Sequence, residues 1–545
     1  MVPHKLNRRL LLLAAIGIVL YVSIMAYNML ASPSSVEEDY SLHAVTKTAA
    51  ADAASQFVRT KFPGITPNGT TVVYQSDQEL SGYLQKSGLY DEYESKYDQR
   101  FPLDFWQVQV KTRTSGTTYT VFVGMDTPEI AGWQKTTSGR KAPPATDGAK
   151  IAAAAVIEMG YKAEEFVYNP DNKTGRGEEP DSTFYTFEST GKTIGESKLL
   201  LQVKVQNGET VSFKPAFSVP SDYMSWLDKQ KKSASWMTLA HVAFTIIMGI
   251  VALVYMIMYA RHISFTRGIV MTLVYTACYV VQTFNMIPAL QTESAEQDSM
   301  MLVILLVVSL LFVLLSAASL YMSLLAGDAL WRHRDRHLWP RWREPDFGQH
   351  ILYAMGRGYL ICLFIMGVQQ VVFFAAEKGF HAFGVNDPMQ SPLNMLWPGL
   401  FPTLAWLAGI SEEILFRLFG IIIFKKLLRN TFLAVLIPNV FWALGHTGYT
   451  IYPSYTRLIE VTLLGFIFGY VFLKYGLYTA IYAHVAMDSI LMAFSYIASE
   501  NTAASVFVGL FYAALPAIVG YAIMLLHARL KPKRPRPEIL PPAAT

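Results

Sequence analysis

Three ionisable residues lie close together inside an apolar run, where charge is costly. Glu412, Glu413 and Arg417 all fall in the stretch from about Leu393 to Phe424, which is long enough to cross a bilayer as a helix. Each charged group costs roughly 2.5–3.5 kcal/mol at the centre of a membrane helix on insertion scales. Ionisable residues inside a membrane mark functional sites by default, so the cluster is the first candidate for chemistry.

Three more ionisable side chains lie deep in later apolar segments. His446 follows Trp442 by four residues, and His484 and Asp488 are also four residues apart. Counted at 1.5 Å per residue from the helix ends, Glu412 and these three residues lie at depths of roughly 15–24 Å. Because a hydrocarbon core is about 30 Å thick, the depths overlap and the side chains can converge.

Helical spacing assigns these residues different tasks. Glu413 and Arg417 can pair on one helix face, which lowers the cost of burying both charges. Glu412 points about 100° away and keeps its carboxylate available. His484 and Asp488 share a face, so the carboxylate can orient the ring and fix its tautomer. Two histidines and a carboxylate could bind a metal, or they could activate and position a water.

The composition indicates a membrane protein with one soluble region. The chain has 545 residues, of which 52% are hydrophobic and 16% charged, and a mean hydropathy of +0.28. Residues 32–235 hold 22 Lys and Arg against 26 Asp and Glu, and the remainder holds 23 against 15. The net charge of +4 is therefore the sum of an acidic soluble domain and a basic membrane part, and it does not indicate nucleic-acid binding. Cys278 and Cys362 both lie in apolar segments, so the soluble region has no disulfide.

The apolar segments predict a polytopic α-helical membrane protein with about ten transmembrane helices. Residues 1–31 form a basic cytoplasmic tail and a retained signal anchor. Nine helices follow in 236–527, and 528–545 form a basic cytoplasmic tail. The nine segments lie at about 236–260, 268–291, 300–326, 349–376, 393–424, 431–452, 458–473, 477–495 and 506–527.

Charge in the short loops predicts the orientation. Basic residues gather in both tails and in alternate connections, above all in the segment Arg332–Arg343, whereas the opposite short loops hold only Lys378 and Arg457. The positive-inside rule then places both termini in the cytoplasm and 32–235 outside it. We expect an integral protein of the bacterial plasma membrane, in contact with the lipid bilayer.

Residues 32–235 are predicted to form an inserted α+β domain with a weak internal duplication. Alternating apolar residues indicate strands with one buried face, and Asn207-Gly208 indicates a hairpin turn. The repeats cover about 44–136, with a helix at 44–62 and strands at 106–110 and 119–123, and about 147–217, with a helix at 147–160 and a strand at 201–205.

This outer domain resembles the PepSY type of extracytoplasmic domain, particularly at Tyr119–Trp133, and a plain α+β spacer is the alternative. It contains no catalytic arrangement of residues, so we expect it to regulate the membrane part or to recruit substrates. Its deletion is expected to leave cleavage by the membrane part intact.

Three ordered motifs in 393–495 resemble the CPBP (CAAX protease and bacteriocin-processing, Abi) family of intramembrane proteases, which includes the type II CAAX prenyl endopeptidases. The motifs are Glu-Glu-x-x-x-Arg, an aromatic residue-x-x-x-His on the next span, and His-x-x-x-Asp two spans later. The resemblance implies an endopeptidase of the glutamic, metal-independent type that acts on membrane-associated peptides or proteins. It implies that Glu412 and His446 activate the attacking water, and that His484 and Asp488 stabilise the oxyanion.

The resemblance also gives Glu413 and Arg417 a supporting role, and two positions depart from the family pattern. Trp442 stands where Phe is usual, and we expect it only to reshape the pocket wall. Asp488 stands where the eukaryotic enzymes have Asn, and an ionised Asp cannot donate to an oxyanion. Asp488 is therefore either protonated or used to orient His484. Some bacterial members carry Asp there, so activity is expected.

Other functions fit parts of this pattern. A zinc-dependent protease would use His446, His484 and Glu412 as ligands, although no His-Glu-x-x-His sequence exists, which excludes an ordinary zincin. Otherwise no cofactor is expected. A non-catalytic adaptor or sensor would use the outer domain to read a ligand and the polar cluster as a scaffold, with buried structural histidines. A proton-coupled transporter is less favoured, since the two halves of the membrane part show no inverted-repeat pattern.

Overall fold

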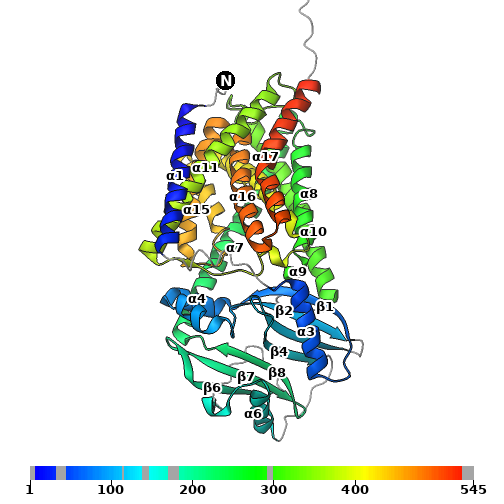
Figure 1. Cartoon of the computed structure of the whole chain (residues 1–545). Coiled ribbons are helices and arrows are strands. Elements are labelled where there is room, and N and C mark those ends of the chain that lie inside the picture. Colours follow the sequence, from blue (N-terminus) through cyan, green and yellow to red (C-terminus); the bar gives the residue numbers. More distant parts are fainter. Residues whose placement is uncertain are drawn as a thin grey trace, which may run out of the picture.

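The structure, a computed structural model, consists of a helical bundle with a β-sheet domain at one end (Figure 1). It describes residues 7–31, 45–112, 116–137, 147–169, 183–290 and 299–530. The predicted integral membrane protein with an inserted α+β domain is thus confirmed at this level. The basic tail predicted at 528–545 lies outside the described residues from position 531 onward.

Within the described ranges, seven helices are long and apolar enough to cross a membrane. They are α1 (Arg8–Ala31), α7 (Ser221–Met258), α10 (Ser299–Arg332), α11 (Phe347–Phe380), α15 (Ser454–Tyr475), α16 (Leu477–Glu500) and α17 (Ala503–Leu530). The other predicted spans correspond to shorter or interrupted helices, which are α8 (Ile269–Asn285), α14 (Thr431–Leu444) and the run of α12, η7 and α13 over 404–428. The total of ten spans stays a prediction. Figure 1 shows the start of α1 and the end of α17 at the end of the bundle opposite the sheet.

The predicted boundary between the two parts, at 235, falls inside a helix. Helix α7 runs without interruption from Ser221 to Met258 and connects the sheet domain to the bundle. Neither proline nor glycine occurs between Pro220 and Gly249, so no helix-breaking residue ends α7 at the membrane surface. The two parts therefore share one continuous helix.

The predicted span at 393–424 is not a continuous helix. Its first residues form the 3-10 turns η5 (Pro392–Asn394) and η6 (Pro398–Thr403), because proline lacks a backbone donor and restricts the residue before it. Helix α12 (Leu404–Glu412) then passes into the π-helical segment η7 (Glu413–Gly420) and α13 (Ile421–Leu428). π-Helical turns are rare and frequently lie at functional sites.

The predicted span at 431–452 also ends early. Helix α14 stops at Leu444, and the chain turns before it forms β10 (Ile451–Tyr452), which pairs with β9 (Phe383–Gly384). Helix α7 crosses closely at this point: a Cβ on Gly445 would lie 2.6 Å from Nδ1 of His241. His446 consequently lies in the turn after α14 and not on a membrane helix.

The sheet domain has eight antiparallel strands in the order β1-β2-β3-β4-β8-β7-β6-β5. The strands are β1 (Pro67–Ser76), β2 (Asp104–Thr112), β3 (Thr117–Gly124), β4 (Ile130–Thr137), β5 (Phe166–Asn169), β6 (Thr183–Ile194), β7 (Ser197–Gln206) and β8 (Glu209–Phe217). Helix α3 (Lys47–Lys61) packs on β1 to β3, and α6 (Gly148–Glu158) packs on β7 and β8. Two units of a helix and antiparallel strands thus meet where Trp133 of β4 pairs with Phe213 of β8. The predicted hairpin is confirmed, with φ of 55° at Asn207 and 75° at Gly208.

The outer domain is fixed to the bundle by buried polar contacts. The Asn394 side chain accepts a hydrogen bond from Tyr74 N (2.7 Å) and donates to Tyr74 O (2.8 Å) and Pro388 O (2.9 Å). Lys47 Nζ donates to Leu393 O. These contacts hold β1 and α3 against the segment that leads into α12. The domain is therefore a docked part of the molecule and not a loosely tethered module.

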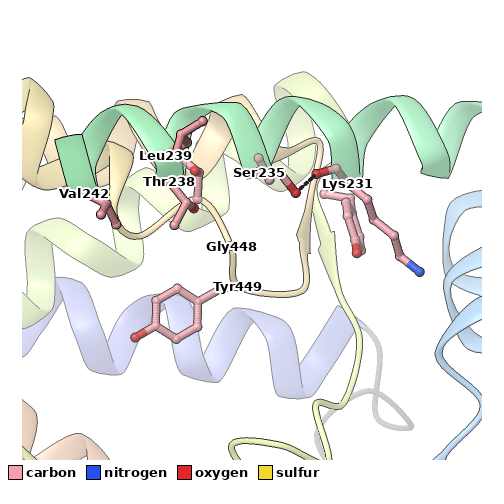
Figure 2. Close-up of a pocket in the computed structure, with 10 residues that line it drawn as sticks. Lys231, Ser235, Thr238, Leu239, Val242, Gly448 and Tyr449 are labelled. Carbon is pink, nitrogen blue, oxygen red and sulfur yellow. Dashed lines mark hydrogen bonds between the residues drawn. The ribbon is translucent and has the colours of Figure 1, made fainter. Parts of the chain in front are cut away.

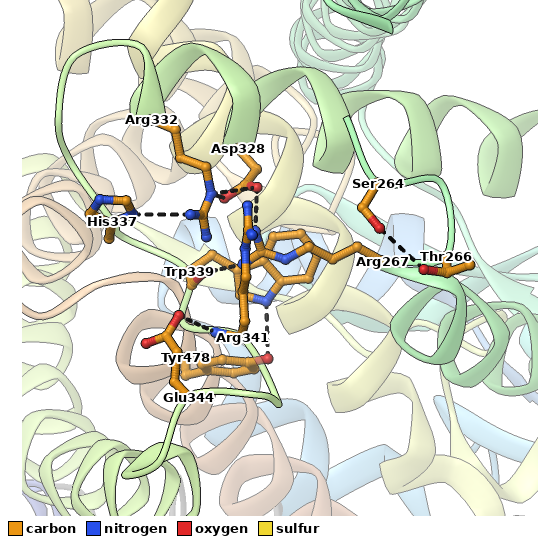
Figure 3. Close-up of polar contacts among 10 residues, drawn as sticks. All are labelled: Ser264, Thr266, Arg267, Asp328, Arg332, His337, Trp339, Arg341, Glu344 and Tyr478. Atoms are coloured by element: carbon orange, nitrogen blue, oxygen red, sulfur yellow. Dashed lines mark hydrogen bonds and ion pairs between the residues drawn. The ribbon is translucent and has the colours of Figure 1, made fainter. Parts of the chain in front are cut away.

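A second polar cluster closes the other end of the bundle (Figure 3). Asp328 on α10 forms ion pairs with Arg267 and with Arg332, whose Nε lies 2.9 Å from Oδ2. The Arg267 guanidinium also lies over the Trp339 ring, 4.0 Å from its centroid, and Trp339 Nε1 donates to the hydroxyl of Tyr478 on α16 (3.0 Å). Largely buried ion pairs and an aromatic bridge thus connect α10 to α16.

A half-buried carboxyl in the outer domain gives a pH-dependent prediction. Asp98 accepts a hydrogen bond from Leu103 N (3.0 Å), and burial raises the pKa of its carboxyl to about 6. Because the folded state favours the protonated form, the stability from this group is fully present below about pH 4 and is lost as the pH rises through about 6. Asp98→Asn keeps the acceptor oxygen. It is expected to raise the free energy of unfolding by about 1–2 kcal/mol near pH 8 and hardly at all near pH 4.

The measurement is denaturant unfolding of the full-length variant and of the wild type at both pH values. Asp91→Asn, at an exposed position, serves as the matched control and is expected to change neither value. Equal effects of Asp98→Asn at both pH values would contradict the assignment.

Candidate active site

Five of the predicted site residues line one cavity of about 420 Å³ in the bundle, and Glu413 and Arg417 lie behind its wall. It lies among α12, α15, α16 and the turn after α14. The structure places Glu412 at the end of α12, Trp442 on α14, His446 in the following turn, and His484 and Asp488 on α16, all in the cavity wall. Segments far apart in sequence therefore bring two carboxylates and two imidazoles to a common space.

The two adjacent glutamates differ in their access to this space. Glu412 has 22% of its side chain exposed, whereas Glu413 has 0%. Arg417 Nη1 lies 3.3 Å from Glu413 Oε1, and the guanidinium carbon lies 4.0 Å from the centroid of the Trp442 ring. A buried ion pair held against an aromatic face supports the helix, and Glu412 is left as the acid that a reactant can reach.

Glu412 is positioned by a donor from α14. Trp442 Nε1 donates a hydrogen bond to Oε2 of the Glu412 carboxylate. The expectation that Trp442 only reshapes the pocket wall is therefore wrong: phenylalanine, usual at this position in the family that the motifs resemble, has no N–H and cannot make this bond. The tryptophan fixes one carboxylate oxygen, which leaves the other for chemistry.

His446 is held by its own turn. Its Nδ1 lies 3.0 Å from the carbonyl oxygen of Trp442, and a carbonyl only accepts, so Nδ1 carries the hydrogen. In the neutral ring the lone pair is then on Nε2. The ring packs against Trp442 (centroids 5.0 Å apart) and Tyr449 (6.1 Å). His446 is thus a preoriented acceptor in the cavity wall.

His484 is oriented by a residue to which the sequence reading gave another task. Its Nδ1 lies 2.9 Å from Glu413 Oε1, and its ring stacks on Phe468 with centroids 4.7 Å apart. Its Nε2 lies 3.5 Å from Asp488 Oδ2 and 3.8 Å from Glu412 Oε2. Glu413 therefore fixes the tautomer, and Asp488 contacts the nitrogen that faces the cavity.

The cavity also contains a polar group that the sequence reading did not include. Glu460 on α15 is buried, pairs with Arg457 and accepts a hydrogen bond from Gln369 Nε2 (2.9 Å). All three side chains line the cavity. The sequence signal was available, because Arg457 and Glu460 are three residues apart on one helix, and a pair at this spacing can lie on one face.

The zinc alternative can be examined through the donor geometry. Across the part of the chain that the structure describes, no group of three or more His, Cys, Asp or Glu side chains is arranged to hold a metal ion. The contact of His484 Nδ1 with Glu413 does not decide between the two mechanisms, because a metal-binding histidine usually donates its other ring N–H to a carboxylate. The dependence of activity on a metal is therefore tested by chelation.

The Trp442 contact leads to a prediction. Trp442→Phe is expected to lower kcat for peptide cleavage about 10–100-fold, because a hydrogen bond to a charged group contributes about 1.5–3 kcal/mol. The matched control is Trp406→Phe on α12, since Trp406 Nε1 makes no hydrogen bond within the described residues. Equal cleavage rates for the two variants, both shown to be folded by circular dichroism, would contradict a role of the Trp442–Glu412 hydrogen bond in catalysis.

The fold and the site define an integral membrane protein whose carboxylates and histidines meet in one intramembrane cavity. Residues 394–490 match the family described as type II CAAX prenyl endopeptidase Rce1-like. This segment is therefore similar to that family, and it contains all the predicted site residues. The match does not include the outer domain, whose resemblance to PepSY stays a prediction.

A curated relative extends the similarity beyond this segment. The chain is 22% identical over 351 residues to the sporulation-killing factor biosynthesis protein SkfC of Bacillus subtilis (strain 168). The aligned region is 59% of this chain and 64% of the relative, so the chain spans under two thirds of that protein's length. No solved structure matches the chain.

Proposed function

We propose that the protein is an intramembrane endopeptidase that hydrolyses peptide bonds of membrane-associated substrates. The observation that carries the proposal is the convergence of Glu412, His446, His484 and Asp488 on one cavity of about 420 Å³. The Rce1-like match over 394–490 supports the reaction class. The mechanism uses these side chains alone and needs no metal.

Glu412 and His446 activate the attacking water. Trp442 holds one oxygen of the Glu412 carboxylate, and the other takes a proton from the water as it attacks the peptide carbonyl. His446 accepts a second hydrogen bond from the water at Nε2, because Nδ1 is bound to the carbonyl of Trp442. A positioned general base contributes typically 10²–10⁴-fold to a rate. Protonated Glu412 then returns the proton to the leaving amine.

His484 and Asp488 stabilise the oxyanion of the tetrahedral intermediate. Glu413 takes the hydrogen on Nδ1 of His484, so donation to an oxyanion requires a hydrogen on Nε2 as well. Two carboxylates, from Glu412 and Glu413, lie beside the ring and suit such an imidazolium. Asp488, 3.5 Å from Nε2, is then the protonated partner and the second donor to the oxyanion. Donors aimed at the developing charge in a water-poor cavity are the largest single term in many hydrolases.

The topology that accompanies this function has both termini in the cytoplasm and the sheet domain outside, in a bacterial plasma membrane. The distribution of Lys and Arg among the short loops supports it. Ser87→Cys in the outer domain and Ser264→Cys at the other end of the bundle provide the test. A membrane-impermeant maleimide added to intact cells should label the first and spare the second, and the reverse pattern would invert the topology.

Purified full-length protein, assayed on a library of membrane-anchored peptides, tests the function. The wild type should cleave a subset, Glu412→Gln none, and exhaustive chelation should change nothing. Loss of activity on chelation, with recovery on adding zinc, would replace the glutamic mechanism with a metal mechanism. Wild-type cellular function in Glu412→Gln would favour the adaptor or sensor instead.

A further inference from the structure

A second hollow lies directly beside the catalytic cavity, between α7 and the loop after α14 (Figure 2). We call it the α7 groove. Its volume is about 600 Å³, and it is lined by Lys231, Thr238, Leu239 and Val242 of α7 and by Gly448 and Tyr449 of the loop. It begins where α7 leaves its tight contact with Gly445 and runs along α7 toward the outer domain.

Tyr449 separates the α7 groove from the catalytic cavity, since it lines both. Figure 2 shows its side chain pointing away from α7. On the catalytic side its ring stacks near His446, with centroids 6.1 Å apart, and lies 5.3 Å from the guanidinium carbon of Arg457. One residue of loop thus lies between the groove and the site where a peptide bond would be cleaved.

The lining of the α7 groove suits a polypeptide in extended form. Leu239 and Val242 offer apolar surface. Thr238 offers a hydroxyl, and the main chain of Gly448 opposite it is accessible because glycine has no side chain. An extended peptide needs both kinds of contact, polar ones for its amides and apolar ones for alternate side chains. From Val242 to Lys231 the helix rises about 16 Å, which is the length of about five extended residues.

We infer that the α7 groove binds an extended segment of the substrate, about five residues long, that continues from the cleaved bond past Tyr449 toward the outer domain. This inference rests on the proposed peptidase function. The substrate class is therefore a polypeptide with an unfolded stretch at the membrane surface next to its cleavage site. At the outer end of the groove, half-exposed Lys231 lies 3.9 Å from Glu79 of the outer domain, so the far end of that stretch meets both a positive and a negative side chain.

Photocrosslinking tests the occupant directly. p-Benzoylphenylalanine replaces Leu239 in full-length Glu412→Gln protein in lipid vesicles, and the probe is a biotinylated peptide that the wild type cleaves. Trp236 is the matched control position, because it lies on the same helix and is more exposed (67% against 53%) but does not line the groove. At least tenfold more peptide adduct at position 239 is expected. A lipid adduct alone at 239 would overturn the inference.

Filling the groove gives a second readout. Gly448→Trp is expected to reduce kcat/KM for a peptide that extends five residues beyond the cleaved bond at least tenfold more than for a peptide truncated there. Trp236→Ala, at an exposed position of α7 that does not line the groove, should leave the ratio between the two peptides unchanged. An unchanged ratio in Gly448→Trp would overturn the inference.

The two proposals fail in different ways. A wild type that cleaves no library peptide contradicts the peptidase function, and the groove is then judged by crosslinking of the library peptides at 239 against 236. Cleavage that is normal while neither groove experiment responds contradicts the groove and leaves the peptidase function in place.

Discussion

Glu412→Gln is expected to lower kcat/KM for peptide cleavage by about 10³-fold or more, since it removes the general base that activates water. Glutamine keeps the shape of the side chain and an oxygen that can accept the hydrogen bond from Trp442 Nε1. The fold should therefore survive while the proton acceptor is lost. The measurement is single-turnover cleavage of a library-derived peptide by purified full-length protein.

Two comparisons make this result specific. Glu377→Gln changes an exposed glutamate that pairs with Lys378 and should leave the rate unchanged. Glu460→Gln changes a buried glutamate of the same cavity that takes no part in the proton transfer, and its loss should be smaller by at least tenfold. Retention of more than a tenth of the wild-type rate in Glu412→Gln would contradict the assignment of the base.

Arg417→Met is expected to reduce the free energy of unfolding by about 3 kcal/mol, the lower end of the range for breaking a buried ion pair. The carboxylate left behind is that of Glu413, which is fully buried and keeps the His484 ring as its remaining partner. The variant also loses the guanidinium contact with the Trp442 ring. Unfolding in denaturant, followed in detergent micelles by tryptophan fluorescence, gives the value.

The double variant Arg417→Met with Glu413→Gln separates charge from packing. If the buried carboxylate without its arginine causes the loss, the double variant should recover at least half of it, because glutamine can still accept the hydrogen bond from His484 Nδ1. Losses that simply add would show that the pair contributes by packing alone. The double variant should remain slow in cleavage, since a neutral amide no longer balances a charged ring.

Sequence spacing was informative wherever partners share one helix. The pairing of Glu413 with Arg417, and the nearness of His484 to Asp488, follow from a separation of four residues and are present at 3.3 and 3.5 Å. The contact of Glu413 with His484 joins residues 71 positions apart. Depth counting could place both at similar levels in the membrane, but it could not say which carboxylate would face the ring.

Helix interruptions set the other limit. Apolar composition predicted a single span over 393–424 and a helical position for His446, because hydropathy does not register 3-10 turns, a π-helical segment or a close crossing by α7. The prolines before Leu404 were a readable signal. The crossing of His241 at Gly445 was not, since those residues come from separate helices.

The contact between the outer domain and the bundle was likewise not visible in the sequence, because it joins residues far apart in the chain. Asn394 and Tyr74 are 320 residues apart, and no local pattern announces that an amide in the membrane part will bond to a strand. Deletion of the domain would remove a partner from a buried amide as well as a regulatory element. The survival of cleavage after deletion of the domain stays a prediction, and a second deletion variant that also carries Asn394→Ala removes the unpaired amide as a separate cause of lost activity.

The Asn394 amide also bears on whether the sheet can pair with other copies of the protein. Strand β1 is an edge strand of the sheet, and the unpaired main-chain groups of an exposed edge strand can pair with strands of other chains. Asn394 engages both main-chain groups of Tyr74, so at that point the border of the sheet is already sealed by the protein's own membrane part. Another copy of the protein therefore cannot form main-chain hydrogen bonds with β1 at Tyr74.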